Sequence, residues 1–225
     1  MTTSYFITGT DTEVGKTFVS SLLLKAAAEA GLQSVGYKPV SAGCELVDGE
    51  MSNEDARSLH TASSLPVSLN EVNPIALMPP IAPHIAAAQV DHTITSEALI
   101  AGFTHLQDKQ PDFLLMEGAG GWRLPLGNDL WMPDVVKSLK LDVIVVVGMR
   151  LGCLNHAMLT CEAIQHDGLN ISGWIANQMS PDMPVYQENL ATLKAAMPAP
   201  MLAEIPYGAG DDTVAALHSL VHKLR

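Results

Sequence analysis

The sequence predicts an α/β fold, a single domain over residues 1–225 with a mostly parallel, Rossmann-like central sheet flanked by helices. Short apolar runs alternate with longer stretches that suit helices, which is the pattern of strand–helix units that feed a parallel sheet. The run 142–148 is unbroken and rich in valine, as expected of a central strand covered on both faces. No linker, low-complexity tract or internal repeat divides the chain.

Six strands and four of the intervening helices can be placed from these runs. The expected strands are residues 5–8, 34–37, 113–116, 143–148, 171–176 and 202–205. The expected helices are residues 16–30, 96–107, 155–166 and 186–197. We expect the proline-rich stretch 73–83 to be an ordered loop rather than a domain boundary.

Composition and charge exclude several classes of partner. Of the 225 residues, 48% are hydrophobic, which is enough to bury the core of one large α/β domain. Acidic side chains number 24 against 12 basic ones, a net charge of -12 that disfavours nucleic acid and anionic membrane surfaces. The 3 cysteines form no CxxC motif, so we expect reduced thiols and a cytoplasmic location. No apolar run approaches the roughly 18–20 residues that span a bilayer.

The strongest motif is a phosphate-binding loop near the N-terminus. A predicted strand leads into Gly9 and the loop ends in Gly15-Lys16-Thr17, after which a helix begins. Backbone N–H groups at a helix start bind phosphate, the lysine reaches the β- and γ-phosphates, and the threonine hydroxyl ligates Mg²⁺. Five residues separate the two glycines, whereas the usual GxxxxGK[ST] spacing has four. The motif nevertheless predicts an ATP site.

A second acidic anchor for the metal is expected at the tip of another strand. Glu117 ends the apolar run 113–116 and precedes the glycine-rich segment 118–121. Ligands of open α/β sheets gather at the carboxyl ends of strands, and Mg²⁺ takes one or two carboxylates. The alternative is a solvated carboxylate at a strand end, followed by a flexible turn.

Several segments together resemble one family. Residues 9–17, 36–40, 117–121, 151–160 and 173–177 occur in the order and approximate spacing of the dethiobiotin synthetases, whose phosphate loop shares the extra residue. The resemblance covers essentially the whole chain. It implies a P-loop ATPase fold, dependence on ATP and Mg²⁺, and a homodimer. It also implies the substrates 7,8-diaminopelargonate and CO₂, which form a carbamate that ATP phosphorylates before the second amine closes the ring.

The resemblance assigns catalysis to Lys38 and Lys16. Lys38 follows a predicted strand and precedes Pro39, which favours an extended backbone that aims the side chain. The alternative is a surface lysine at a strand end. The family pattern Lys-Pro-Val-Ala-Ser-Gly is changed here to Lys-Pro-Val-Ser-Ala-Gly. Substrate contact by the Ser41 side chain and contact by the Ala42 backbone therefore both remain open.

The resemblance also assigns the nucleotide and metal sites. Asp55 matches the family's metal-binding aspartate, although the dipole of a helix beginning near it would equally favour a carboxylate. Asn177 can donate to and accept from an adenine edge, or it can simply be a turn residue at a strand end. The expected metal ligands are Thr17, Asp55 and Glu117. The expected nucleotide contacts are Glu13, Val14, Gly15, Lys16, Thr17, Phe18, Asp55, Glu117, Gly118, Ala119, Gly120, Asn177, Gln178, Pro206, Tyr207 and Gly208.

A turn further along the chain is expected to bind the substrate carboxylate. The resemblance assigns this role to Gly152, Cys153, Leu154 and Asn155 of the other subunit, so the substrate site lies at the dimer interface, which is expected to include residues 151–159. The alternative is a simple strand–helix turn with Asn155 as the helix N-cap. Cys153 is expected to pack in the core rather than act as a nucleophile.

Two rival functions share the phosphate loop. A ParA/MinD-like switch ATPase carries a lysine early in the loop, where this chain has Asp11. A small-molecule kinase clamps its phosphates with several arginines, and this chain has only four. Both interpretations therefore fit the residues less well than a synthetase.

Overall fold

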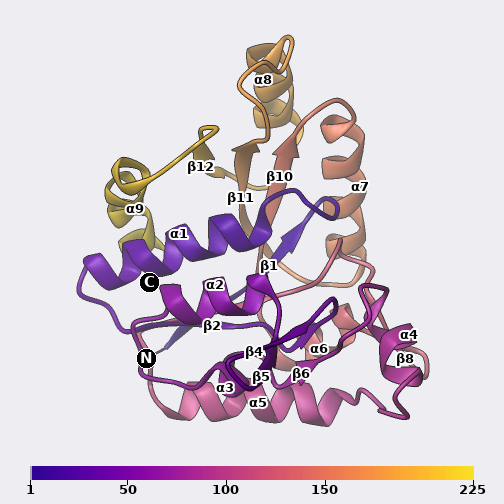
Figure 1. Cartoon of the computed structure of the whole chain (residues 1–225). Coiled ribbons are helices and arrows are strands. Elements are labelled where there is room, and N and C mark those ends of the chain that lie inside the picture. The colour runs from indigo at the N-terminus through magenta and orange to yellow at the C-terminus, as the bar shows by residue number, and fades with distance from the viewer. Residues whose placement is uncertain (1) are drawn as a thin grey trace.

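The computed structural model describes residues 2–225, and its centre is a six-stranded parallel sheet with the strand order β12-β11-β10-β1-β7-β2 (Figure 1). All six expected strands are present, which confirms the predicted α/β fold. The strands are β1 (Thr3–Gly9), β2 (Ser34–Tyr37), β7 (Phe113–Glu117), β10 (Asp142–Met149), β11 (Ile171–Gln178) and β12 (Met201–Ile205).

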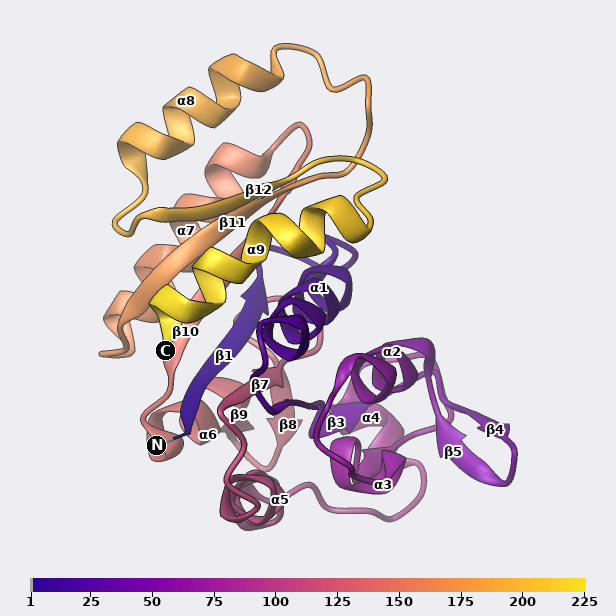
Figure 2. The same cartoon turned by 90° about the vertical axis from the view of Figure 1, so that its left-hand side faces the viewer.

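Helices cover both faces of this sheet. On one face α1 and α9 lie side by side, and α7 and α8 lie on the opposite face (Figure 2). The four expected helices are present with small shifts at their ends. The helices are α1 (Lys16–Glu29), α2 (Glu54–Ala62), α3 (Leu69–Val72), α4 (Pro83–Ala88), α5 (Ser96–Asp108), α6 (Met132–Leu139), α7 (Cys153–His166), α8 (Tyr186–Ala196) and α9 (Asp211–Leu224).

The valine-rich strand β10 shows why two cores form. Val143, Val145 and Val147 belong to the core under α5, α6, α7 and α8. Ile144 and Val146 belong to the core under α1, α2 and α9. Because successive side chains of a strand point to opposite faces, an unbroken apolar run buries both faces of the sheet, as predicted.

Small paired strands shape the chain around the end of the sheet. β3 (Val40–Ser41) pairs in parallel with β6 (Ile75–Ala76), which lies within the proline-rich stretch 73–83. Two further pairs are antiparallel. They are β4 (Glu45–Val47) with β5 (Glu50–Ser52), and β8 (Pro125–Gly127) with β9 (Leu130–Trp131). Residues 73–83 thus contain the strand β6 and the first residue of α4 (Pro83–Ala88), rather than a loop alone. No helix within residues 2–225 is long and apolar enough to cross a membrane.

The sheet brings three chemically active segments to one edge. β1, β7 and β2 are adjacent parallel strands, so their carboxyl ends meet. The phosphate loop follows β1, Lys38 follows β2, and Glu117 is the last residue of β7. Segments more than 20 and 70 residues apart along the chain therefore converge at the position where open α/β sheets bind ligands.

Candidate nucleotide and substrate site

The phosphate loop presents the bare N-terminus of a helix. α1 begins at Lys16, and its N-cap Gly15 has φ +84° and offers no side-chain cap to the first N–H groups. Glu13 also adopts a left-handed conformation, with φ +57°. Successive N–H groups in such a turn form a concave anion site, and the helix dipole adds to it. The loop with the extra residue thus has the backbone geometry that a phosphate requires.

An asparagine from β11 holds this loop against the sheet. The Asn177 amide donates to the Val14 carbonyl at 2.9 Å, and the side chain is buried. The same amide occupies the space that a Cβ at Gly15 would need. A Cβ at Gly9 would lie only 2.5 Å from the Val14 side chain. Both loop glycines are therefore required by close packing, and Gly15 also by its positive φ.

Lys16 and Asp11 make a second set of loop contacts. The Lys16 ammonium donates to the Asp11 carbonyl at 3.2 Å. The Asp11 carboxylate accepts from the Thr12 N–H at 2.8 Å and from the Arg150 guanidinium at 2.6 Å. Burial lowers the pKa of Lys16, and the nearby Lys38 ammonium lowers it further. Lys16 thus lies in the loop with a weak backbone partner that a phosphate oxygen can replace.

A buried charge cluster lies beside the loop. Lys38 is 2% exposed, and its ammonium donates to Glu117 Oε1 at 2.7 Å, to Asp55 Oδ2 at 2.9 Å and to the Gly118 carbonyl at 3.3 Å. Glu117 is fully buried and also accepts from the hydroxyls of Thr17 at 2.7 Å and Ser20 at 2.8 Å. Lys38 is therefore no surface lysine, and Glu117 is no solvated carboxylate.

The pKa values of the cluster favour its ionised form. Burial acts to lower the pKa of Lys38, but the carboxylates of Glu117 and Asp55 outweigh it, so the pKa is raised. Burial acts to raise the pKa of Asp55, but the Lys38 ammonium outweighs it, so this pKa is lowered. Asp55 lies in the first turn of α2, as expected, and its side chain pairs with Lys38 at 2.9 Å.

The oxygen atoms around Lys38 fit a magnesium ion. The Thr17 hydroxyl bonds to Glu117 and also lies beside Asp55, whose carboxylate is 44% exposed toward the cavity. Hydroxyl and carboxylate oxygens are the donors that Mg²⁺ prefers, and it usually takes only one or two carboxylates. No cluster of three or more His, Cys, Asp or Glu side chains capable of holding a metal occurs among residues 2–225. The donor set thus suits an ion that arrives with phosphate oxygens rather than a closed protein cage.

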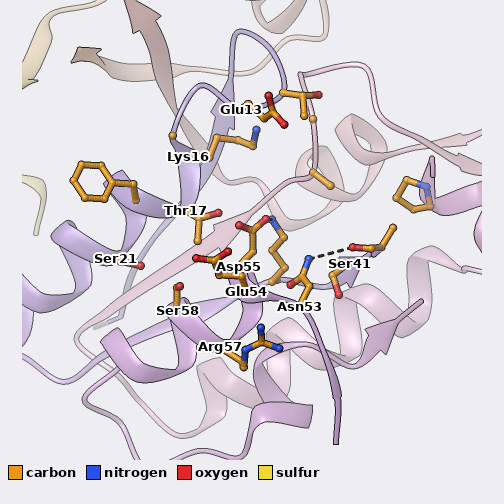
Figure 3. A pocket seen from close by; sticks show the side chains of 18 of the residues that line it. Glu13, Lys16, Thr17, Ser21, Ser41, Asn53, Glu54, Asp55, Arg57 and Ser58 are labelled. Atoms are coloured by element: carbon orange, nitrogen blue, oxygen red, sulfur yellow. Dashed lines mark hydrogen bonds and ion pairs between the residues drawn. The ribbon is translucent and has the colours of Figure 1, made fainter. Parts of the chain in front are cut away.

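Lys16, Thr17, Lys38 and Asp55 line a cavity of about 1140 Å³ between α1, α2 and residues 80–83. Lys16, Thr17 and Asp55 approach the same space from two sides (Figure 3). Of the expected contacts, the cavity wall includes Glu13, Gly15, Lys16, Thr17, Phe18, Lys38, Ser41, Ala42, Asp55, Ala119 and Gly120. The volume exceeds the need of a triphosphate alone and leaves room for a second small molecule.

Ser41 and Ala42 contribute to this wall in different ways. The Ser41 hydroxyl is buried and donates to Asn73 Oδ1 at 2.6 Å. The Ala42 carbonyl accepts from the Asn53 amide at 3.2 Å, the contact drawn as a dashed line in Figure 3. Both residues line the cavity, so the two alternatives for substrate contact stay open.

The cavity wall does not include the other expected contacts, which are Val14, Glu117, Gly118, Gly152, Cys153, Leu154, Asn155, Asn177, Gln178, Pro206, Tyr207 and Gly208. Asn177 and Gln178 end β11, and Pro206, Tyr207 and Gly208 follow β12, at the edge beyond the phosphate loop. The Tyr207 N–H donates to Gln178 Oε1 at 3.4 Å, so these two segments touch. Their position beside Val14 is compatible with a base that extends from the phosphates.

The turn after β10 differs from one expectation. Gly152, with φ +96°, is the N-cap of α7, and the helix begins at Cys153. The alternative in which Asn155 caps the helix is wrong, because Asn155 already lies within the first turn. The helix start has no side-chain cap, and the Cys153 N–H donates to the Arg150 carbonyl at 3.0 Å, so the N–H groups that follow it in the first turn are the ones that an anion could meet. Leu151 next to it is 99% exposed.

Four neighbours of the site carry no sequence motif. Ser20 is three residues after Thr17 on α1, so both hydroxyls face Glu117 from the same side of the helix, a relation that helical spacing could have indicated. The contacts of Asn73 and Arg150 join segments far apart in the chain, and only the fold reveals them. Asn53 is an ordinary N-cap by sequence and by structure.

A phosphate loop before α1, a buried strand-end carboxylate and a parallel sheet together define a P-loop NTPase. A family profile described as an AAA domain matches residues 3–210. The ParA family ATPase of Chlorobium tepidum TLS superposes with TM-score 0.57 at 13% identity, covering 100% of this chain and 93% of that one. A chain of the MinC:MinD cell division protein complex of Aquifex aeolicus gives a TM-score of 0.55 at 14% identity, covering 99% of this chain and 86% of that one. These likenesses show the fold alone.

Sequence relatives identify the family within this class. The ATP-dependent dethiobiotin synthetase BioD of Alteromonas mediterranea is 58% identical over 216 residues, covering 92% of this chain and 93% of the relative. The enzyme of the same name in Cellvibrio japonicus is 50% identical, with coverage of 90% and 89%. BioD 1 of Salmonella typhi is 48% identical, with coverage of 92% and 90%. The chain belongs to the ATP-dependent dethiobiotin synthetases, which are enzymes of the ligase type.

Proposed function

We propose that the chain closes 7,8-diaminopelargonate and CO₂ into dethiobiotin at the expense of ATP. One amine adds to CO₂ to form a carbamate, and a carbamate oxygen displaces ADP from the γ-phosphorus. The second amine then attacks the carbonyl carbon of this mixed anhydride and phosphate leaves. The names of the relatives support the reaction, and the buried Lys38 beside the phosphate loop is the observation that carries it.

The reaction brings two anions together, and Lys16 and Lys38 address that repulsion. Lys16 exchanges its backbone partner for phosphate oxygens. Lys38 exchanges one of its three acceptors for an oxygen of the carbamate or of the transferring phosphoryl group. Fixed cationic donors in a water-poor site stabilise developing charge at little reorganisation cost. The raised pKa of Lys38 keeps it protonated for this role.

We propose that Thr17, Asp55 and Glu117 hold Mg²⁺ when the nucleotide is present. The ion supplies charge neutralisation and a template for the phosphate oxygens. Asp55 is the ligand with free access to the cavity, since Glu117 is fully buried. An Asp55→Asn variant should need a higher Mg²⁺ concentration for half-maximal ATP binding, measured by calorimetry. An unchanged Mg²⁺ dependence would exclude Asp55 as a ligand.

We propose that the adenine lies along Asn177, Gln178 and residues 206–208. The amide nitrogen of Asn177 already donates to Val14, so its oxygen is the group that can accept from the adenine amino group. Gln178 and the backbone after β12 complete the edge. An Asn177→Ala change would also release the phosphate loop. Binding of ATP and of inorganic triphosphate to the variant separates the two effects. Loss of the adenine contact should weaken the binding of ATP alone, whereas release of the phosphate loop should weaken the binding of both ligands.

Phosphate release is the test of the reaction. Purified protein with ATP, Mg²⁺, bicarbonate and 7,8-diaminopelargonate should release phosphate, and omission of the diamine or of bicarbonate should stop the release. A nucleoside in place of the diamine tests the kinase alternative, and ATP alone tests a switch ATPase. Turnover that is unaffected by the diamine would refute the proposal. Lys38→Met is the matched inactive control.

We propose a homodimer in which α7 of one subunit completes the active site of the other. A nine-carbon acid extends well away from Lys38, and its carboxylate needs a separate site. The uncapped start of α7 offers N–H groups for it. The exposed apolar side chains of Leu151 and Leu159, 99% and 56% exposed, support a contact there. The functional protein would then be a cytoplasmic homodimer of single-domain chains. The thiols of Cys44, Cys153 and Cys161 are all buried and form no disulfide.

Mixed dimers test this arrangement. A Lys38→Ala chain lacks the catalytic lysine, and a Gly152→Trp chain blocks the carboxylate site. If sites are shared, a dimer of the two variants regains about one working site, because each defect falls on the same site and leaves the other intact. Background activity after confirmed subunit exchange would reject the shared site.

A further inference from the structure

Lys38 lies beyond the hydrogen-bonding ladder of the sheet. β2 is an edge strand that pairs only with β7, and the pairing ends at Tyr37 opposite Met116. Lys38 is 2% exposed, so its backbone N–H and carbonyl cannot rely on water. Pro39 follows it and has no N–H to pair. The sheet itself therefore does not hold the backbone from which the catalytic side chain extends.

Two consecutive residues at the C-terminal end of α3 satisfy the hydrogen bonds of this backbone. The Val72 carbonyl accepts from the Lys38 N–H at 2.8 Å. The Asn73 amide nitrogen donates to the Lys38 carbonyl at 2.6 Å. The Asn73 amide oxygen accepts from the Ser41 hydroxyl, also at 2.6 Å. Asn73 is itself 3% exposed, so a single buried amide joins both ends of the segment 38–41.

Asn73 is in turn fixed by its own helix. The Asn73 N–H donates to the Leu69 carbonyl at 2.8 Å, at the end of α3. A capping box between Ser68 and Glu71 stabilises the start of this four-residue helix. The amide is therefore presented by a short, well-capped element rather than by a free loop.

We propose that Asn73 is a positioning residue for Lys38 in the proposed reaction. The Lys38 ammonium must leave one acceptor and meet an oxygen of the substrate, and its reach is set by where its backbone lies. Displacement by about 1 Å at a reacting group can cost about 10²-fold in rate. An amide suits the place because it donates to a carbonyl and accepts from a hydroxyl at once. An ionised carboxylate cannot donate, and alanine does neither.

The test compares Asn73→Ala and Asn73→Asp with a matched control. Asp keeps the shape and the acceptor for Ser41 but loses the donor to the Lys38 carbonyl. Ser34→Ala is the control, because the buried Ser34 hydroxyl donates to the Leu24 carbonyl at 3.0 Å at the opposite end of the same strand. We expect kcat for diamine-dependent phosphate release to fall about 10²-fold in both Asn73 variants. Their Kd for ATP should stay within about threefold, since Lys16 and the loop are untouched.

The control separates positioning from stability. Ser34→Ala should lower the Tm while kcat stays near the wild-type value. If either folded Asn73 variant keeps the wild-type kcat, the proposal is overturned. If both variants fail to fold, Asn73 has a purely structural role and the proposal is likewise overturned. The inference rests on the proposed function, and the two fail differently: wild-type protein without diamine-dependent turnover refutes the function, whereas an active wild type with unaffected variants refutes only the positioning.

Discussion

Replacing Lys38 with methionine should weaken the fold as well as stop the reaction. Methionine has a similar length but no charge, so it leaves the fully buried Glu117 carboxylate without its cation. Removal of one partner from a buried pair costs about 3–5 kcal/mol. The hydroxyls of Thr17 and Ser20 still donate to Glu117, which places the cost near the lower end, about 3 kcal/mol. For a chain of this size that corresponds to a drop in Tm of about 6–12 °C.

The double variant Lys38→Met with Glu117→Gln separates the two effects. Gln is neutral, so no unpaired charge remains, and most of the lost stability should return. The reaction should not return, because the loss of one fixed donor costs about 3–4 kcal/mol of transition-state stabilisation. Lys109→Met is the matched control, since Lys109 pairs with Glu71 at the surface at 2.8 Å. Exposed pairs contribute about 0.2–1 kcal/mol.

Urea unfolding measures the free energies, and phosphate release measures the activity. The urea concentrations at the unfolding midpoints are compared only between proteins with the same dependence of the unfolding free energy on urea concentration. A changed dependence would indicate an altered denatured state. A Lys38→Met protein as stable as the wild type would contradict the buried pair. So would a double variant no more stable than Lys38→Met, because the cost would then come from lost packing rather than from the unpaired carboxylate.

The remaining predictions concern the loop and the pH dependence. Gly15→Ala should weaken ATP binding at least about tenfold in calorimetry, because the added Cβ would collide with the buried Asn177 amide and the backbone has a positive φ. Gly31→Ala is the control: its φ is +81° but the space around it is open, so it shows the effect of backbone strain alone and should leave ATP binding unchanged. Lys16→Met should weaken ATP binding by a similar factor, and tight binding by this variant would contradict its phosphate contact. Asp55 has a lowered pKa in the folded state, so its stabilising contribution is present above the unfolded value of 3.8 and is lost as the pH falls through the folded value. The stability difference between wild type and Asp55→Asn should therefore shrink between pH 5 and about pH 3 in unfolding experiments, and a constant difference would refute the ion pair.

The sheet was predictable because local sequence decides it. Each expected strand is a short apolar run with a turn or helix at its end, and tertiary contacts only extended these runs by a few residues. β10 grew from 143–148 to Asp142–Met149, and β11 from 171–176 to Ile171–Gln178. The phosphate loop was equally readable, since its function depends on the backbone of one continuous segment.

The unpredicted elements depend on contacts across the chain. β3 and β6 have two residues each, and they form only because Val40 and Ser41 meet Ile75 and Ala76. α9 follows the last predicted strand and was not placed, although its apolar side chains Val214, Leu217 and Val221 repeat at helical spacing. The helical repeat of apolar residues in α9 was therefore present in the sequence, whereas strands of two residues are too short to show an alternating pattern.

Some site residues could be predicted from the local sequence, and others could not because only the fold connects them to the site. The residue types of Lys16, Thr17 and Glu117 indicated their chemistry, and the structure brings them together at the end of the sheet. The partners that fix them could not be predicted, because Asn73 and Arg150 are connected to the site only through space. The Arg150–Asp11 pair spans 139 residues. It also brings a cation from the turn after β10 to Asp11, early in the phosphate loop.

The charge balance of the cluster bears on how the site works. Lys16 and Lys38 supply two positive charges, and Asp55 and Glu117 supply two negative charges, so the four groups cancel. Around them the chain carries a net charge of -12. A triphosphate and a carbamate would therefore enter a site with no surplus positive charge to offset them. A divalent cation bound with the nucleotide would supply that surplus, and Lys38 could then donate to the carbamate in place of one of its carboxylates. On this argument the incoming anions, rather than an excess of negative charge in the protein, set the requirement for Mg²⁺, and a variant with neutral residues at the proposed ligand positions 55 and 117 should need a higher Mg²⁺ concentration for ATP binding even as it loses catalysis.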